Sequence, residues 1–356
     1  MRCADVAFLV TLGLATVPSM SVAQTARAET VEIVSDGVRL AGTLYLPGIE
    51  PAAAVVLLGV AGPDDRDLRL GSLAPFRALA EHLQQAGLAV LSLDDRGVGG
   101  SGGDWWLADY ATLAADALSA VEYIAWRPDV DAARIGLFGL SEGSAIAMIA
   151  AAHAPERIAF LILGSPPGLP GEATLRGQLE DALKTSPAAV ADPVRAAFDR
   201  FVGLARGAAT DSTVLAEFAA FLAGPGALLI PPYRFVPATP GARAALFSGP
   251  WYRSQLDYDP ATFLARVTAP TLVIGGALDP VLPPAKHHPP LAAGIGSRDV
   301  RFDVVDGVNH LLLPAETGSP AEYGRIREPA DTRVLERITE WLAARGLTGG
   351  VRAIER

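Results

Sequence analysis

The sequence predicts an α/β fold: a doubly wound, mostly parallel sheet that follows an antiparallel hairpin and is interrupted once by a helical cap. Three observations support this prediction. Short apolar runs alternate with helical segments through most of the chain, which is the pattern of a parallel sheet with helices on both faces. An alternating pattern surrounds Asp36 and Gly37 before the first apolar run. Residues 166–269 show helical periodicity but no strand pattern.

The composition of the 356-residue chain is that of a globular protein, with 50% hydrophobic and 19% charged residues. Its formal net charge of −10 argues against nucleic acid and against an anionic membrane surface as partners, because both would repel an acidic chain. The only cysteine is Cys3. The remaining residues therefore offer no disulfide, thiol nucleophile or cysteine metal site.

Residues 1–23 are predicted to be a signal peptide. Arg2 precedes an apolar run over residues 6–20, and a small-x-small cleavage site follows at residues 21–23. Residues 26–28 form a second candidate cleavage site. The run is too short to span a membrane stably; a buried N-terminal helix is the alternative. We therefore expect a periplasmic or secreted protein without stable membrane insertion.

Residues 24–165 are predicted to form the first part of the sheet domain. The segments 31–34 and 40–46 alternate in polarity on either side of Asp36 and Gly37 and predict the hairpin. Four continuous apolar runs predict strands that are buried on both faces, at residues 53–58, 88–93, 134–138 and 159–164. Helical spacing between the runs predicts three helices, near residues 76–86, 107–124 and 143–153.

The predicted cap, residues 166–269, separates this part from the second part of the domain, residues 270–356. Its helical stretches are punctuated by Pro and Gly, and a structureless loop of that length would be exceptional. Trp251 and Tyr252 near its end are candidates for lining a substrate pocket, with simple packing as the alternative. The sheet then resumes with two apolar runs and ends with an amphipathic helix, at residues 271–276, 300–305 and 331–344.

The segment from Gly139 to Gly143 reads Gly-Leu-Ser-Glu-Gly and lies between a predicted strand and a predicted helix. A serine in such a sharp turn has a strained backbone, and glycines on either side remove side chains that would collide. Ser141 is therefore the candidate nucleophile. The amide of Glu142 is a candidate oxyanion donor, because it follows the nucleophile at the start of the helix. An ordinary glycine turn in a parallel sheet is the alternative.

A serine nucleophile needs a base, and the base needs an acid that orients it. Among the five histidines, only His310 follows a late predicted strand, where it would reach the carboxyl edge of the sheet. Asp279 follows the preceding predicted strand and is the candidate acid, with Asp303 and Asp306 as fallbacks. The chain order Ser141, Asp279, His310 is the one expected for a nucleophile in a strand-to-helix turn and differs from the orders in two unrelated serine protease folds.

The second oxyanion donor should come from the loop after the first apolar run. Ala61 is the candidate, because a small residue in a glycine-rich loop lets its amide approach the substrate; Val60 is the alternative. The charged residues of this loop and of the loop near residue 95 are predicted to form ion pairs that brace the site. The side chain of Glu142 is predicted to pair with Arg66 or Arg96 rather than to contact substrate.

Nearly all of the chain after the signal peptide resembles bacterial serine esterases of the α/β-hydrolase superfamily, including carboxylesterases close to its dienelactone-hydrolase-like and acyl-CoA-thioesterase-like members. The matching motifs lie at residues 62–67, 95–101, 139–143, 248–252, 270–274 with Asp279, 309–312 and 317–323. The resemblance implies the α/β-hydrolase fold and a triad of Ser141, Asp279 and His310. Gly59 and Val60 stand where the family usually has His-Gly or Ser-Gly, which leaves open which amide of that loop donates.

We therefore expect an exported serine hydrolase that cleaves carboxylic esters of small to medium acyl groups through an acyl-enzyme. Its partner would be a small-molecule ester. The chemistry needs no cofactor or metal, and the adjacent His287 and His288 lack carboxylates at ligand spacing. A thioesterase, acyltransferase or peptidase would use the same triad, and a binding protein on a hydrolase scaffold is a further alternative. A dehalogenase is excluded, since it needs a carboxylate in place of Ser141.

Overall fold

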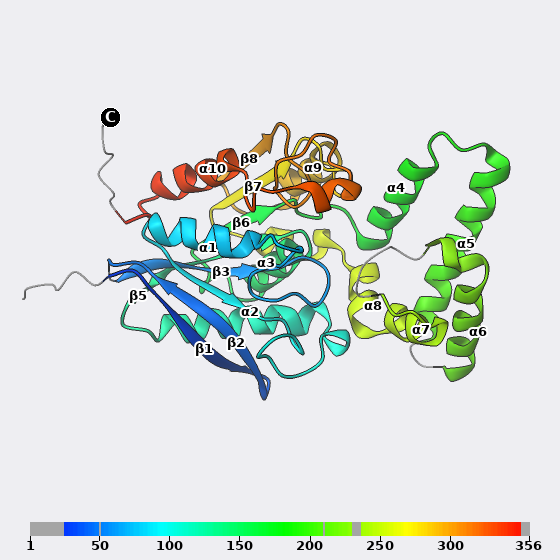
Figure 1. The fold of residues 1–356 in the computed structure, drawn as a ribbon, viewed down its shortest axis with the longest axis horizontal. Helices are drawn as coiled ribbons and strands as arrows, with labels where there is room; N and C mark the ends of the chain where they lie inside the picture. Colours follow the sequence, from blue (N-terminus) through cyan, green and yellow to red (C-terminus); the bar gives the residue numbers. More distant parts are fainter. Residues whose placement is uncertain (1–24, 50, 209–210, 230–235, 350–356) are drawn as a thin grey trace, which may run out of the picture.

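The computed structural model describes residues 25–49, 51–208, 211–229 and 236–349. Its centre is one eight-stranded sheet with the strand order β1-β2-β4-β3-β5-β6-β7-β8, and helices cover both faces (Figure 1). Strands β3 to β8 run parallel, whereas β1 and β2 are antiparallel to their neighbours. The predicted doubly wound α/β fold with an N-terminal hairpin is therefore confirmed. The predicted signal peptide lies outside the described residues.

Each predicted apolar run corresponds to a strand, although two runs were predicted to begin one residue earlier than β4 and β6 do. The strands are β1 (Arg27–Ser35), β2 (Val38–Leu46), β3 (Ala52–Leu58), β4 (Ala89–Leu93), β5 (Val130–Leu140), β6 (Phe160–Gly164), β7 (Thr271–Gly276) and β8 (Val300–Val305). The central strands β3 and β6 are almost wholly buried, as continuous apolar runs require. Asp36 and Gly37 form the hairpin turn with φ of 47° and 76°, the positive values that a two-residue type I′ turn needs.

Helices from both halves of the chain pack around this sheet. They are α1 (Pro75–Gln85), α2 (Tyr110–Ala125), α3 (Glu142–His153), α9 (Pro284–Gly294) and α10 (Thr332–Ala343), with a short 3-10 turn η5 (Pro320–Arg325). Buried side chains of α2 and α3 belong to one apolar cluster, and those of α1 and α10 belong to another. Helices α1 and α10 lie on one face of the sheet, and α2 lies on the other (Figure 1).

The first turn of α2 differs from the prediction. The helix starts at Tyr110 because Asp109 caps it, its side chain accepting a hydrogen bond from a first-turn amide. The residues before it form a separate 3-10 turn, η1 (Trp105–Leu107). This turn places Trp105 against Trp251, with ring centroids 4.5 Å apart.

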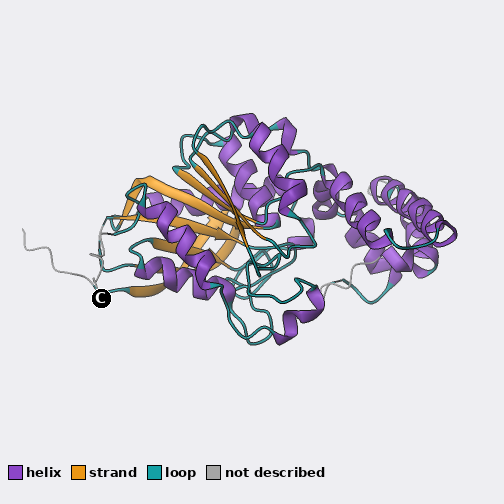
Figure 2. Cartoon of the chain, turned by 90° about the horizontal axis from the view of Figure 1, so that it is seen from above, coloured by secondary structure: helices purple, strands orange, loops and turns teal. Residues whose placement is uncertain are grey.

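Between β6 and β7 the described residues form helices and no strand. The helices are α4 (Gly171–Leu183), α5 (Ala188–Gly207), α6 (Ser212–Ala223), α7 (Pro240–Ser248) and α8 (Pro250–Asp257), with 3-10 turns η2 (Pro225–Leu229), η3 (Pro260–Thr262) and η4 (Leu264–Arg266). We call residues 166–269 the cap. Helices α5, α6 and α7 project away from the sheet, and α8 lies between them and the sheet domain (Figures 1 and 2).

Aromatic side chains pack together inside the cap, and they belong to the same apolar cluster as the buried side chains of α2 and α3. Phe201 of α5 packs on Phe218 of α6 and on Phe247 of α7, with centroid separations of 5.3 Å in both cases. Tyr252 of α8 completes the group, 5.0 Å from Phe247. Burying each such side chain contributes about 1.5–3 kcal/mol. None of the described helices combines the length and apolar character needed to cross a membrane.

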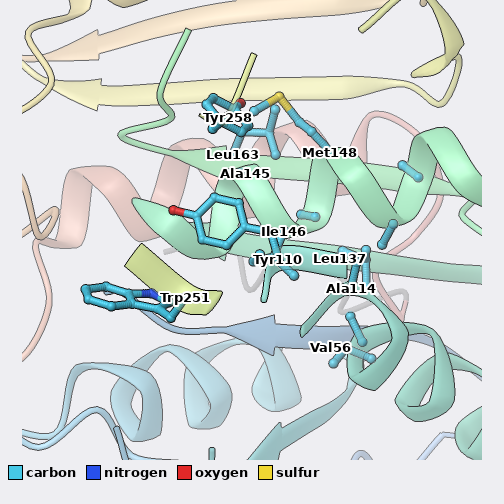
Figure 3. Packing of buried hydrophobic residues seen from close by; sticks show 14 of the residues in the cluster. Val56, Tyr110, Ala114, Leu137, Ala145, Ile146, Met148, Leu163, Trp251 and Tyr258 are labelled. Atoms are coloured by element: carbon cyan, nitrogen blue, oxygen red, sulfur yellow. The ribbon is translucent and has the colours of Figure 1, made fainter. Parts of the chain in front are cut away.

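Apolar side chains fill the space between the sheet and helices α2 and α3. Val56 of β3 and Leu137 of β5 are wholly buried there against Ile146 of α3. Ala114 and Ala145, which have small side chains, allow the helix backbones to approach (Figure 3). This packing fixes the carboxyl end of β5 and the start of α3, where the candidate nucleophile lies.

Candidate active site

Ser141 is the single residue between β5 and α3. Its φ of 58° and ψ of −115° are a conformation that costs a residue with a side chain about 1–3 kcal/mol. A Cβ on Gly139 would lie 2.2 Å from the Gly143 carbonyl oxygen, and a Cβ on Gly143 would lie 2.2 Å from the Leu58 carbonyl oxygen. The two glycines are therefore a steric requirement of this turn.

Further hydrogen bonds hold the nucleophile turn in its strained form. The Ser141 amide donates to the Gly164 carbonyl at 2.8 Å. Ser144 Oγ lies 2.7 Å from the Gly139 carbonyl oxygen and 2.9 Å from that of Gly164. The sequence analysis did not single out Ser144. Apart from Glu142 at its start and His153 at its end, Ser144 is the only polar residue of α3, and this was the signal that could have identified it.

The structure brings Ser141, His310 and Asp279 together from the ends of three different strands. His310 Nε2 lies 2.9 Å from Ser141 Oγ, and His310 Nδ1 lies 2.8 Å from Asp279 Oδ2. The two latter residues are buried, with 6% and 4% of their surface exposed. A carboxylate at Nδ1 keeps the imidazole proton on that nitrogen, so that Nε2 can accept the serine proton.

Hydrogen bonds keep the Asp279 carboxylate ionised. Burial opposes its charge, but the hydrogen bond from His310 and those from the amides of Leu282 and Val281 hold its pKa below the ordinary value. These amides donate to Oδ1 at 2.9 and 2.8 Å. The other oxygen, Oδ2, is thus left for the imidazole.

The loop that carries His310 is fixed by its neighbour Asn309, which is wholly buried. Asn309 Oδ1 accepts hydrogen bonds from the amides of Leu311 at 2.9 Å and Leu313 at 3.1 Å. Leu312 between them adopts a φ of 58°. An asparagine that replaces backbone acceptors in this way allows a tight turn directly after the imidazole. Asn309 belongs to the motif at residues 309–312, but the sequence pattern alone did not indicate this role.

The remaining candidates for acid or metal ligand lie outside this arrangement. Asp303 pairs with Arg301 at 2.7 Å, and Asp306 is exposed. His287 Nδ1 accepts a hydrogen bond from the Gly168 amide at 3.1 Å, and burial lowers the pKa of His287 to about 4. His287 is therefore a neutral residue that holds the chain after β6. Among the residues described, no group of three or more His, Cys, Asp or Glu side chains could hold a metal ion.

The candidate oxyanion donors come from the two segments that meet beside Ser141. The Gly143 amide donates to the Gly59 carbonyl at 2.8 Å, which holds the loop after β3 against the start of α3. Within the described part of the chain, the amides of Glu142, Ala61 and Val60 donate no hydrogen bond. They are therefore available to a substrate oxygen, and the positive end of the α3 dipole favours negative charge at the same place.

The predicted ion pair between Glu142 and a loop arginine is wrong. Arg66 binds Asp94, with Nη2 and Oδ2 2.6 Å apart, and Arg96 binds Asp116 of α2 through two hydrogen bonds of 2.7 Å. Each arginine thus has a two-point carboxylate partner, the geometry that guanidinium groups prefer. The Arg66 pair does brace the two loops against each other, as predicted.

The side chain of Glu142 instead contacts two aromatic residues. Its Oε2 accepts hydrogen bonds from Tyr110 Oη at 3.0 Å and from Trp251 Nε1 at 2.9 Å. The partners are separated from Glu142 by long stretches of chain, and nothing in the sequence pattern connects them. Sequence reasoning therefore missed this contact.

The electrostatic surroundings of Glu142 favour its neutral form. Burial raises the pKa of Glu142 to about 8, although the hydrogen bonds from Trp251 and Tyr110 lower it, and the negative charge of Asp64 raises it further. Burial also raises the pKa of Asp95 well above its usual value. The carboxyl groups of Glu142, Asp64 and Asp95 line part of a cavity of about 70 Å³ beside the loop after β3.

The two candidate substrate residues occupy different positions. Trp251, 2% exposed, packs on Trp105 and binds Glu142, so it lies where the cap meets the nucleophile turn. Tyr252, 6% exposed, packs on Phe247 inside the cap. Contact of either side chain with substrate stays a prediction.

Comparisons with known proteins agree with the observed fold. A sequence model of the alpha/beta hydrolase fold matches residues 59–316. Esterase EstD of Thermotoga maritima is 26% identical over 305 residues, which cover 85% of this chain and 65% of EstD. Rhodomycin D methylesterase DauP of Streptomyces sp. strain C5 is 31% identical over 286 residues, which cover 76% of this chain and 89% of DauP.

Solved structures show the same architecture. The crystal structure of the alpha/beta hydrolase GrgF from Penicillium sp. sh18 superposes with a TM-score of 0.57 and 20% identity, covering 89% of this chain and 98% of GrgF. At that level of identity the likeness concerns the fold alone.

Proposed function

The chain belongs to the α/β hydrolase fold family, and from this premise we propose that it is an exported serine hydrolase that cleaves carboxylic esters of small to medium acyl groups. One observation carries the proposal: a continuous hydrogen-bonded line from Ser141 Oγ through His310 to Asp279, with distances of 2.9 and 2.8 Å. These distances are within reach for proton transfer.

In acylation, Ser141 Oγ attacks the carbonyl carbon of the ester while His310 Nε2 takes the hydroxyl proton. The carbonyl π electrons move to oxygen, and the amides of Glu142 and Ala61 stabilise this oxyanion. When the carbonyl forms again, the bond to the alcohol oxygen breaks and His310 returns the proton to that oxygen. The Asp279 carboxylate stabilises the imidazolium between the two steps.

Deacylation repeats the same steps with water. His310 Nε2 removes a proton from water as the water oxygen attacks the acyl carbon. Collapse of the second oxyanion breaks the bond to Ser141 Oγ, which takes the proton from His310. The products are the carboxylic acid, the alcohol and the free enzyme, with no cofactor or metal in either step.

The ester class is supported by two relatives. EstD is named an esterase and DauP a methylesterase. The cap is rich in Ala, Gly and Pro over its length, which favours small or medium acyl groups. Trp251 stands where the cap meets the nucleophile turn, so we assign to it, with Tyr252 behind it, the wall that limits substrate size.

Export is proposed from the N-terminal pattern, and the start of β1 favours one of the two cleavage sites. Arg27 pairs with Leu46 in the hairpin and bonds to Asp129 at 3.0 Å. Cleavage after Ala28 would remove this residue, whereas cleavage after Ala23 keeps it. N-terminal sequencing of the protein recovered from the periplasm or medium should begin at Gln24; recovery of the uncleaved chain from the cytoplasm alone would contradict export.

The test of the hydrolase proposal is hydrolysis of p-nitrophenyl esters from acetyl to palmitoyl, with Ser141→Ala as the matched control. Wild type should show a chain-length optimum that Ser141→Ala abolishes, and a fluorophosphonate should label wild type only. Labelling without ester cleavage would move the substrate class to thioesters or amides. Neither turnover nor labelling would leave a binding protein on a hydrolase scaffold.

A further inference from the structure

Glu142 contributes a backbone amide and a buried carboxyl group to the site, and the mechanism proposed above uses only the amide. The side chain is 7% exposed, and burying a carboxyl group is costly unless donors satisfy it. It occupies the first residue of α3, directly after Ser141. The burial of this carboxyl group therefore points to a role for the side chain as well as for the backbone amide.

One oxygen of this side chain joins three elements. Tyr110, whose hydroxyl donates to Oε2, begins α2, and Trp251, whose indole N–H donates to the same atom, belongs to α8 of the cap. Burial raises the pKa of Tyr110 well above its usual value, which keeps this hydroxyl a donor. Figure 3 shows both rings within the buried cluster. The contact is therefore a buried junction between the nucleophile turn, the sheet domain and the cap.

The charged surroundings of the junction are mostly acidic. Titratable and charged groups reach it from four elements: Asp64 and Asp65 of the loop after β3, Asp94, Asp95 and Arg96 of the loop after β4, Tyr110 and Asp116 of α2, and Tyr258 at the end of α8. The one arginine among them binds Asp116. No cation therefore offsets a negative charge on Glu142 within the described residues.

We propose that the side chain of Glu142 is a positioning residue for the ester cleavage proposed above: through Trp251 and Tyr110 it holds the oxyanion amide in place against the cap. Amide and carboxyl belong to one residue, so a shift of α8 is transmitted directly to the oxyanion donor. This effect appears in kcat, because the oxyanion exists only in the transition state and intermediates.

The same geometry makes the junction sensitive to pH. An ionised carboxylate one residue from the nucleophile would repel the oxyanion, so the protonated side chain is the productive form. With the Glu142 pKa at about 8, wild-type kcat should fall about ten-fold between pH 7 and pH 9. Glu142→Gln keeps an acceptor oxygen for both donors but cannot ionise, so its kcat ratio between these pH values should fall less than about two-fold. The rate of Ser141→Ala serves as the blank at each pH.

Trp251→Phe tests the coupling to the cap. It keeps a ring but removes the N–H donor, and we expect kcat for p-nitrophenyl acetate to fall about ten-fold with KM little changed. Trp341→Phe is the matched control, because Trp341 is also buried but its Nε1 has no hydrogen-bond partner among the described residues. Thermal unfolding confirms that both variants are folded; Tyr110→Phe replaces Trp251→Phe if the latter does not fold.

The outcomes separate this inference from the function on which it rests. Wild type without turnover or fluorophosphonate labelling overturns both. An active wild type with an alkaline decline equally steep in Glu142→Gln overturns only the positioning role. A loss of kcat in Trp251→Phe no larger than in Trp341→Phe overturns the coupling to the cap.

Discussion

The sheet domain and the cap are built in different ways. In the sheet domain, continuous apolar strands such as β3 are buried on both faces, and the candidate triad lies at strand ends within it. In the cap, a few aromatic rings around Phe201 hold helices that carry many exposed ion pairs, such as Arg206 with Asp257. The groups proposed to make and break bonds thus belong to the sheet domain, and the groups proposed to shape access belong to the cap.

Several polar contacts join the two regions, including the ion pair of Asp181 with Lys286 of α9 and the hydrogen bond from the Gly168 amide to His287. On one side, Trp251 bonds to Glu142, and Ser254 Oγ accepts a hydrogen bond from the Tyr110 amide at 3.2 Å. On the other side, Gln178 of α4 bonds to the Val281 carbonyl at 2.8 Å, next to Asp279. These contacts bring the cap to residues beside Ser141 and Asp279.

The largest expected effect lies wholly within the sheet domain. Asp279→Asn keeps the shape of the side chain but removes the charge that stabilises the imidazolium, and kcat for p-nitrophenyl acetate should fall by about 10⁴-fold. Steady-state kinetics beside a thermal unfolding curve provides the measurement. A loss smaller than about ten-fold in a folded variant would contradict the assignment of Asp279 and place the orienting charge elsewhere.

Two core substitutions test whether the cap can open while the sheet domain stays closed. Phe218→Ala in the cap and Leu91→Ala in β4 each remove a fully buried side chain, at about 3–5 and 2–5 kcal/mol. Hydrogen exchange should show opening confined to the cap for Phe218→Ala, and opening of the whole sheet for Leu91→Ala. Ser141 of Phe218→Ala should still be labelled by a small fluorophosphonate. Opening of the sheet in both variants would show that the cap does not open separately from the sheet domain.

The contact between the regions should make stability depend on pH. An unfolded glutamate ionises near 4.5, whereas Glu142 in the folded chain does so near 8. Between these values the unfolded state has lost a proton that the folded state still holds, so raising the pH favours unfolding by about 1.4 kcal/mol per pH unit. Urea unfolding of wild type minus that of Glu142→Gln should show this slope, with a plateau above pH 8. A difference independent of pH would contradict burial of this group as an acid.

The smallest expected effect concerns the surface of the cap. Arg206 bridges Glu172 of α4 and Asp257 of α8 with contacts of 2.8 and 2.9 Å, but all three side chains are partly exposed. Solvent screening limits such pairs to less than about 1 kcal/mol. Arg206→Ala should therefore leave the unfolding midpoint and the esterase rate nearly unchanged, and a larger loss would mean that ion pairs rather than aromatic packing hold the cap helices together.

Much of the sheet domain could be predicted because its signals are local. The runs at β3 and β6, the hairpin turn at Asp36 and Gly37, and the glycines around Ser141 each follow from steric or burial requirements within a few residues. The observed helices and strands differ from the predicted ones at their first residues. Asp109 starts α2 at Tyr110, and β5 begins at Val130 because Val130 pairs with Ala52 of β3 before the predicted apolar run.

The partner of Glu142 could not be predicted, and the prediction made for it was wrong. Arg66 and Arg96 of the two loops beside the site were the candidates, but Asp94 and Asp116 bind them in the folded chain. The partners that Glu142 does have come from α2 and from the cap, where no periodicity or spacing connects them to the nucleophile turn.

Short-range sterics and apolar patterning specify the sheet, the hairpin, the nucleophile turn and the order of the candidate triad, so these features follow from local sequence. Which amides and side chains meet around Ser141, and the contact of a cap tryptophan with the neighbouring residue, follow only from the folded chain. Hydrogen bonds and electrostatic effects depend on distances between segments remote in the chain. Those distances exist only once the sheet and the cap have packed against each other.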